Sequence, residues 1–303
     1  MKRLWTENAE AIAWVATSTA IFSLIFASGK FAGDSASVFQ INFLRSVGGF
    51  LTLAVIVLIR GEGLRNYTSR RPFAHFMRAI FGVCGALAVI QASADMPIVD
   101  ATAMSLLYVV FVVLLGMLIF RERIGRRQAA GIVICGGGAL TIMMARGAFQ
   151  NFDPAYFTPA LLAMSGAALF AFEGILIKVL SQSDRPLTVL LHVSIFGLMM
   201  LAVPTFLVWK PLPSMDILGY MLLGPLGIAA QYCTIRGYRM ADISVVGPVD
   251  YSWLVFAALI GFAFFNEIPT MGVLIGAVLI AGGGIVLATV RPAREKQPTL
   301  EMQ

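Results

Sequence analysis

The chain has 303 residues, of which 59% are apolar and only 13% are charged, and its formal net charge is +6. Soluble domains are about 45–50% apolar and about 25% charged, so this composition excludes an ordinary soluble protein. Apolar runs recur about every thirty residues, and each is close to the roughly 20 residues that span the hydrocarbon core of a bilayer. The sequence therefore predicts an integral membrane protein.

Ten apolar segments are predicted to be transmembrane helices, which gives an all-α fold. In chain order they cover residues 10–32, 36–59, 72–94, 99–121, 127–145, 157–180, 186–209, 215–237, 243–266 and 270–290. The connections between them are too short to hold a soluble domain. The first segment follows Lys2 and Arg3, as a signal peptide would. It matches the sixth segment through Ala20/Ala168 and Phe22/Phe170, so it is expected to be retained.

Positive charge is concentrated in alternate connections. Lys and Arg are enriched in the cytoplasmic loops of membrane proteins, which predicts that both termini are cytoplasmic. The second and fourth connections carry most of this charge: Arg60, Arg65, Arg70, Arg71, Arg121, Arg123, Arg126 and Arg127. The net charge follows from this topology and requires no nucleic-acid partner.

The two halves of the chain repeat one pattern. Gly116, Phe120 and Glu122 each match a residue 145 positions later, namely Gly261, Phe265 and Glu267, while the surrounding arginines are not repeated. Five helices per half place the second copy upside down, so the matched loops face opposite compartments. We expect residues 1–146 and 147–291 to be inverted five-helix repeats around a central cavity, followed by a cytoplasmic tail, 292–303. Glu122 and Glu267 are expected to cap helices or fix loops.

Three short motifs carry a resemblance to a known family. The fourth helix of each half ends in FRE (120–122) or FNE (265–267) before a glycine-rich fifth helix, and the second helix contains FLRS (43–46). The sequence resembles the EamA family of the drug/metabolite transporter superfamily. The resemblance implies export of small metabolites across the bacterial cytoplasmic (inner) membrane, with a substrate cavity between the halves. In overall texture it is similar to the YddG-type amino-acid exporters of that family.

Four ionisable residues lie at a similar depth inside the predicted spans. Arg78, Glu173, His192 and Asp250 are each six or seven residues from the predicted cytoplasmic end of their helix, or roughly 10 Å at 1.5 Å per residue. A charge in hydrocarbon costs about 2.5–3.5 kcal/mol, so each needs a reason. One reading is a polar layer beside the cavity, in which Arg78 neutralises one carboxylate and another titrates. The other is a structural ion pair with side chains that snorkel to the interface.

Polar and aromatic groups near the middle of the spans are candidates to line a pocket, since amphipathic ligands need apolar contact and a few oriented polar groups. Helix packing or an interfacial belt is the alternative for each of them. The predicted substrate-binding residues are Ser18, Arg78, Gln91, Tyr108, Glu173, Gln231, Tyr232, Tyr251 and Trp253. Predicted hinges are Pro225, Gly247 and Pro248, because proline frees backbone carbonyls in a membrane helix.

The chain lacks the motifs of several other classes. It has no GxxxxGK[ST] loop, no HExxH and no GxSxG, so ATP hydrolysis, metalloprotease and serine-hydrolase chemistry are not expected. We expect neither a cofactor nor a bound metal. The function predicted is an alternating-access exporter of small metabolites, most simply amino acids, including aromatic or other apolar ones. The alternatives are a multidrug or other metabolite carrier and a membrane enzyme or sensor. Proton coupling and a monomeric or dimeric state are left open.

Overall fold

The computed structural model describes residues 2–32, 36–96, 98–150, 155 and 157–290. The predicted tail, 292–303, lies outside this range. Within it, the regular structure is helical. The elements are α1 (Lys2–Ala32), α2 (Val38–Arg60), η1 (Leu64–Tyr67), α3 (Pro72–Asp95), α4 (Ile98–Ser105), α5 (Tyr108–Ile119), α6 (Arg126–Ala145), α7 (Phe157–Ser183), α8 (Pro186–Leu207), α9 (Ser214–Met240), α10 (Ile243–Val246), η3 (Gly247–Tyr251), α11 (Ser252–Phe265) and α12 (Met271–Ala288).

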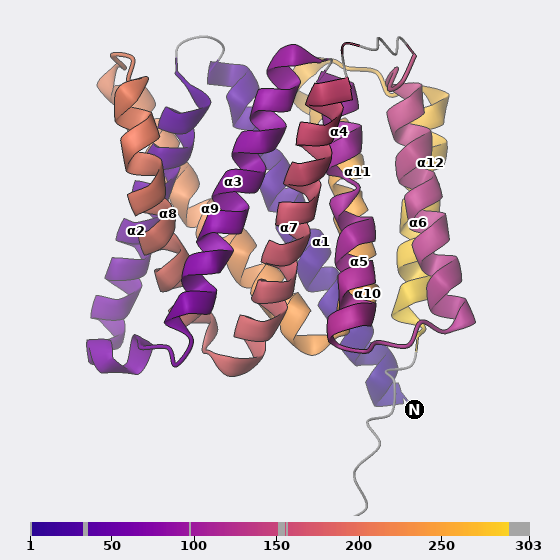
Figure 1. The fold of residues 1–303 in the computed structure, drawn as a ribbon, viewed down its shortest axis with the longest axis horizontal. Helices are drawn as coiled ribbons and strands as arrows, with labels where there is room; N and C mark the ends of the chain where they lie inside the picture. The colour runs from indigo at the N-terminus through magenta and orange to yellow at the C-terminus, as the bar shows by residue number, and fades with distance from the viewer. Residues whose placement is uncertain (1, 33–35, 97, 151–154, 156, 291–303) are drawn as a thin grey trace, which may run out of the picture.

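The predicted set of ten spans is confirmed. Ten helical stretches in the described residues are long and apolar enough to cross a membrane, and they stand side by side in Figure 1. Local sequence explains several of their ends. Ser37 and Gln40 form a reciprocal capping box at the start of α2, which ends at Gly61 in the left-handed conformation (φ 61°). Pro72 and Pro186 begin α3 and α8 at the position where the missing N–H costs nothing.

The fourth span is not a single helix, contrary to the prediction, and the ninth span is interrupted as well. The fourth consists of α4 and α5, which are separated at residues 106–107, and the ninth consists of α10, the 3₁₀ segment η3 and α11. The ninth span changes to 3₁₀ geometry at Gly247 and Pro248, two of the predicted hinges. The third predicted hinge behaves differently, because α9 continues as one helix through Pro225.

One end of the bundle carries the Arg-rich connections together with the start of α1 and the end of α12. The Asn8 Nδ2 donates to the Val290 backbone oxygen at 2.7 Å, which joins the start of α1 to the end of α12. The connections from α2 to α3, α5 to α6 and α7 to α8 lie at this same end (Figure 1). We call this end, with its Arg-rich connections, the terminal face, and the opposite end the far face.

Helices α6 and α12 pack closely through glycines. A Cβ on Gly138 would lie 2.7 Å from the backbone oxygen of Gly276, and one on Gly283 would lie 2.9 Å from that of Gly131. The sequence repeat relates Gly131 to Gly276 and Gly138 to Gly283. Gly138 therefore packs against Gly276, the counterpart of Gly131, and Gly131 packs against Gly283, the counterpart of Gly138. Small residues that let two backbones approach are the usual basis of helix packing in membranes.

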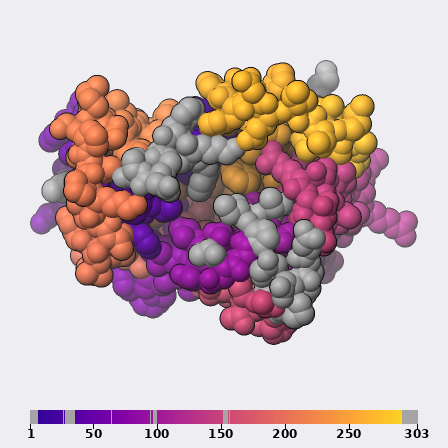
Figure 2. All heavy atoms as spheres, turned by 90° about the horizontal axis from the view of Figure 1, so that it is seen from above, coloured from indigo at the N-terminus to yellow at the C-terminus, as the bar shows by residue number. Residues whose placement is uncertain are grey.

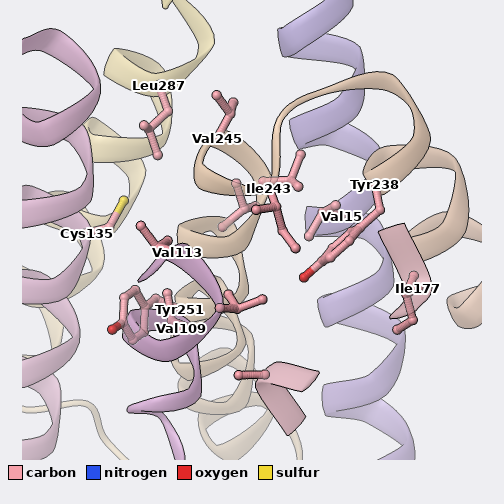
Figure 3. Packing of buried hydrophobic residues seen from close by; sticks show 14 of the residues in the cluster. Val15, Val109, Val113, Cys135, Ile177, Tyr238, Ile243, Val245, Tyr251 and Leu287 are labelled. Atoms are coloured by element: carbon pink, nitrogen blue, oxygen red, sulfur yellow. The ribbon is translucent and has the colours of Figure 1, made fainter. Parts of the chain in front are cut away.

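Most of the buried apolar core surrounds α5, α10 and η3 and extends to the terminal-face halves of α7 and α9. Figure 3 shows part of this cluster, with Tyr238 on the α1 side and Tyr251 on the α6 side. A second cluster, toward the far face, contains only Ala92, Met96, Ala101 and Ala163. Figure 2 shows the far face hollowed near its middle. Along α6 and α12 the larger cluster extends to the far face, through Met143, Ala148 and Val273.

Glu122 joins the two halves at the terminal face. Its carboxylate accepts hydrogen bonds from the backbone N–H groups of Ile243 (2.9 Å) and Ser244 (3.0 Å) and from the Ser244 hydroxyl. Gln128 also donates to that hydroxyl, at 2.6 Å. Glu122 therefore caps a helix, as expected, but the helix is α10 in the other half and not α6, which follows it in the chain.

Candidate functional site

A buried polar group lies where α3, α7 and α9 meet. Arg78 projects from α3, six residues after Pro72, and its side chain has no solvent exposure. Its Nη2 donates to Gln231 Oε1 on α9 at 2.6 Å. Its Nε lies 3.7 Å from Glu173 Oε1 on α7. The structure thus brings together three of the predicted substrate-binding residues, and two of them belong to the predicted polar layer.

A glycine on α3 makes room for the Glu173 carboxylate. A Cβ on Gly82 would lie 2.9 Å from Glu173 Oε2. Gly82 is one turn beyond Arg78, so the carboxylate lies across the face of α3 that also carries the guanidinium. Further along, Gly85 and Gly166 let the backbones of α3 and α7 approach each other. The sequence of α3 therefore provides both the charge and the space for its counter-ion.

Asp250 forms a second polar group with two tyrosines. The Tyr238 hydroxyl on α9 donates to Asp250 Oδ2 at 3.2 Å. The Tyr108 side chain at the start of α5 also lies close to the Asp250 carboxylate. The Tyr238 hydroxyl oxygen lies 4.0 Å from the position that a Cβ on Gly174 would take, next to Glu173 in the chain. The two polar groups are therefore neighbours across α7.

The Arg78–Glu173 pair has unused hydrogen-bonding capacity. Arg78 Nε and Nη1 are buried without a hydrogen-bond partner in the described part of the protein, and 18% of the Glu173 side chain is exposed. Buried polar atoms normally have partners, and leaving one without costs about 1–3 kcal/mol. A carboxylate fits the free N–H groups, because guanidinium donors match its two oxygens.

His192 lies apart from these groups, although the sequence placed it at the same depth. Its ring stacks on His75 with centroids 4.3 Å apart, and its Nδ1 lies 2.9 Å from the Thr188 backbone oxygen. His75 Nε2 is 2.8 Å from Asp184 Oδ2 in the turn between α7 and α8. His75 is one turn closer to the terminal face than Arg78, so His192 belongs to a separate cluster there.

Other predicted substrate-binding residues occupy different environments. Ser18 is buried between α1 and α9, where its hydroxyl contacts Thr234 at 2.7 Å. Gln91 is exposed near the end of α3 and donates to Asp95. Tyr232 is exposed on α9, with its ring edge toward Trp14 at 6.1 Å.

The two predicted substrate-binding residues of the ninth span lie at the α10–α11 break. Tyr251 is buried in the core cluster on the side of α6 (Figure 3). Trp253 is half-buried, and its backbone oxygen accepts a hydrogen bond from Ser23 at 3.4 Å. Tyr108 and Gln231 are thus the predicted pocket residues that join the charged ones.

Sequence reasoning missed Tyr238 and His75. Tyr238 is close to the end of its helix, where an aromatic residue resembles an interfacial anchor. Its partner Asp250 lies beyond the turn between α9 and α10. The two residues are therefore on different elements, and their spacing in the sequence does not predict the contact. No group of three or more potential metal ligands occurs among the described residues.

The model of the EamA-like transporter family matches twice, at residues 9–144 and 157–289. The chain belongs to the EamA-like transporter family. Its two matched segments correspond closely to the two predicted halves.

Three relatives of the chain are named for the transport of different metabolites. The chain is 26% identical to a riboflavin transporter of Rhizobium johnstonii, over 82% of this chain and 81% of the relative. It is 23% identical to an S-adenosylmethionine uptake transporter of Rickettsia prowazekii, over 89% of each chain. It is 27% identical to a pseudopaline exporter of Pseudomonas aeruginosa, over 88% of this chain and 92% of the relative.

A solved crystal structure has the same fold. It superposes with a TM-score of 0.78 at 21% identity and covers 92% of this chain and 97% of the other. Together with the ten spans, the family assigns the chain as a multi-pass membrane protein and a metabolite transporter. Its named relatives are bacterial, in agreement with the bacterial inner membrane.

Proposed function

We propose that this transporter exports amino acids or metabolites with an amino-acid head group from the cytoplasm. The observation that carries the proposal is the fully buried Arg78, with two N–H positions free, beside the partly exposed Glu173. In this proposal the substrate carboxylate binds Arg78, and its ammonium group binds Glu173 or Asp250. Tyr108 and Gln231 orient the charged groups.

The chemistry of the relatives' substrates supports a zwitterionic head group. S-adenosylmethionine, the substrate in the name of the Rickettsia relative, is itself an α-amino-acid derivative. Riboflavin, in the name of the Rhizobium relative, is an uncharged aromatic compound by contrast. It supports the second candidate, a carrier of other metabolites or drugs, because Tyr108 and Phe170 form an aromatic edge-to-face pair 6.5 Å apart beside the site.

Two features of the fold support inverted repeats and alternating access. The glycines of α6 and α12 contact each other's repeat counterparts. The interruption of the fourth span at residues 106–107 corresponds to residues 251–252 at the end of η3. Two related halves around one site provide two related gates. The Arg-rich connections favour a cytoplasmic terminal face, so the hollow of Figure 2 would open outward.

The test is counterflow in proteoliposomes that are preloaded with unlabelled amino acids and probed with labelled ones from either side. Arg78→Gln, Glu173→Gln and Asp250→Asn should abolish most of the accumulation while folded yield is retained. Arg65→Gln and Glu10→Gln, which change exposed residues, are the matched controls. A separate run with a pH gradient tests proton coupling. Accumulation of riboflavin but of no amino acid would favour the second candidate.

A further inference from the structure

A second arginine lies inside the membrane on the opposite side of the site from Arg78. Arg45 is seven residues from the far-face end of α2, and Arg78 is six residues from the terminal-face end of α3. At 1.5 Å per residue these positions are about 10 Å and 9 Å from opposite ends of the bundle. The two arginines therefore lie in opposite halves of the membrane thickness.

Arg45 has little within reach to balance its charge. Its Nη2 donates to Asn42 Oδ1 at 3.0 Å, one turn earlier on the same helix. Among the described residues, no carboxylate lies within ion-pair distance of its guanidinium. Arginine in hydrocarbon is costly and normally pairs with another group. A neutral amide oxygen orients the guanidinium but leaves the positive charge uncompensated.

Gly227 on α9 makes room for the Arg45 side chain. A Cβ on Gly227 would lie 3.5 Å from Arg45 Nη1 and 3.9 Å from its Cδ, and no other heavy atom would lie within 4 Å of it. Gly227 is one turn before Gln231, the residue that binds Arg78. The two guanidinium groups therefore contact the same face of α9, one helical turn apart.

We propose that Arg45 is a second carboxylate-binding residue of the transport pathway, positioned by Asn42 and located on the far-face side of Arg78. The ligand class is a carboxylate, and the inference rests on the proposed function in taking the pathway to run along this face of α9. The guanidinium offers two parallel N–H donors to a carboxylate. Arg45 Nη1 lies beside Gly227, so no side chain at that position of α9 covers it. A carboxylate released by Arg78 would then meet another cation one turn further along its exit.

The first test does not require a known substrate. Arg45→Cys is made in a chain whose exposed Cys84 is replaced by Ser, and thiol labelling is measured with membrane-impermeant methanethiosulfonates applied from the far face. We expect Arg45→Cys to react, and the anionic sulfonate reagent to react several-fold faster than the cationic ammonium reagent, because Arg78 remains nearby. Leu51→Cys, an exposed position on α2, is the lipid-facing control. No reaction at position 45, or faster reaction with the cation, would overturn the proposal.

The second test uses the amino acid with the largest counterflow signal and its carboxamide, which lacks the negative charge. Arg45→Gln should raise the KM for the amino acid by roughly tenfold or more, as expected for a lost charged hydrogen bond. The KM for the carboxamide should hardly change, and Arg45→Lys should restore part of the difference. Equal losses for both compounds would indicate a structural role and refute the proposal.

A glycine variant tests the same site with its arginine intact. Gly227→Ala places a methyl group at ordinary contact distance from Arg45, so it fits the fold but covers the Nη1 assigned to the ligand. It should raise the KM for the amino acid, whereas Gly219→Ala, with nothing within 4 Å, should not. If no amino acid gives counterflow, the proposed function fails, and the thiol labelling still decides whether Arg45 lines an aqueous, anion-selective path.

Discussion

Glu122 should contribute strongly to stability although it lies in a loop. It accepts two backbone N–H bonds and one hydroxyl bond from the start of α10, and hydrogen bonds to charged groups contribute about 1.5–3 kcal/mol each. Glu122→Gln keeps one acceptor oxygen but points an NH₂ group at a backbone N–H. It therefore loses at least one charged bond, and we expect the free energy of unfolding to fall by about 2–3 kcal/mol.

The measurement is the free energy of unfolding in mixed detergent micelles, followed by circular dichroism. Ser244→Ala removes the hydroxyl's bonds to Glu122 and from Gln128 and should cost about 1.5–3 kcal/mol. The double variant should cost less than the sum, because both changes remove one shared contact. Glu62→Gln is the matched control, since Glu62 meets Arg185 at 3.4 Å on the surface and such pairs contribute at most about 1 kcal/mol. If Glu122→Gln costs no more than Glu62→Gln, the cap does not stabilise the fold.

Two further predictions follow from close contacts and one from a partly buried loop carboxyl. Gly276→Ala would place a Cβ 2.5 Å from a side-chain carbon of α6, so it should lower the free energy of unfolding by about 1–3 kcal/mol, whereas Gly282→Ala, with nothing within 4 Å, should not lower it. Gly82→Ala would push the Glu173 carboxylate from its place and should raise the transport KM, with folded yield retained in size-exclusion chromatography. Asp242, between α9 and α10, has its pKa raised by burial and then by Glu122, against the opposing effect of Lys178. Because the folded pKa exceeds the usual 3.8, the folded state favours the protonated form, and stability falls as pH rises through the raised pKa. Asp242→Asn should flatten this part of the pH–stability curve, and an unchanged curve would contradict the assignment.

The number of spans was predictable because hydrocarbon imposes length and composition directly on sequence. The α4–α5 break was not, because residues 106–107 are apolar and lack proline or glycine. The Gly247–Pro248 break carried a clear signal, since proline removes a donor. Pro225 carried the same signal but α9 continues through it, as membrane helices tolerate proline when neighbours satisfy the freed groups.

The candidate site was only partly predictable, for a geometric reason. Depth along a helix follows from residue number, so Arg78, Glu173 and Asp250 could be placed in one layer. Direction around the helix axis does not follow when every face is apolar. His192 has the expected depth but faces His75. Tyr232 faces Trp14, whereas Gln231, the residue before it, binds Arg78.

The charges of the site are divided between the two halves of the chain, and this division predicts how its variants should differ. Both arginines, Arg45 and Arg78, come from the first half, while Glu173 and Asp250 come from the second. A zwitterionic substrate bound by an arginine of the first half and a carboxylate of the second would connect the two halves. Alternating access requires these halves to move relative to each other. The carboxylate and the ammonium of the substrate should then depend on different halves.

This dependence can be measured by competition against amino-acid counterflow with two analogues, an amine without the carboxylate and a carboxylic acid without the amine. Arg78→Gln should weaken competition by the acid and leave the amine nearly unaffected, because the amine never met the guanidinium. Asp250→Asn should do the reverse. Arg78→Gln also frees Glu173 from its ion pair, so any small change in competition by the amine should be a gain. If both variants weaken both analogues alike, the residues act on the fold or on coupling, and the substrate does not bridge the two halves.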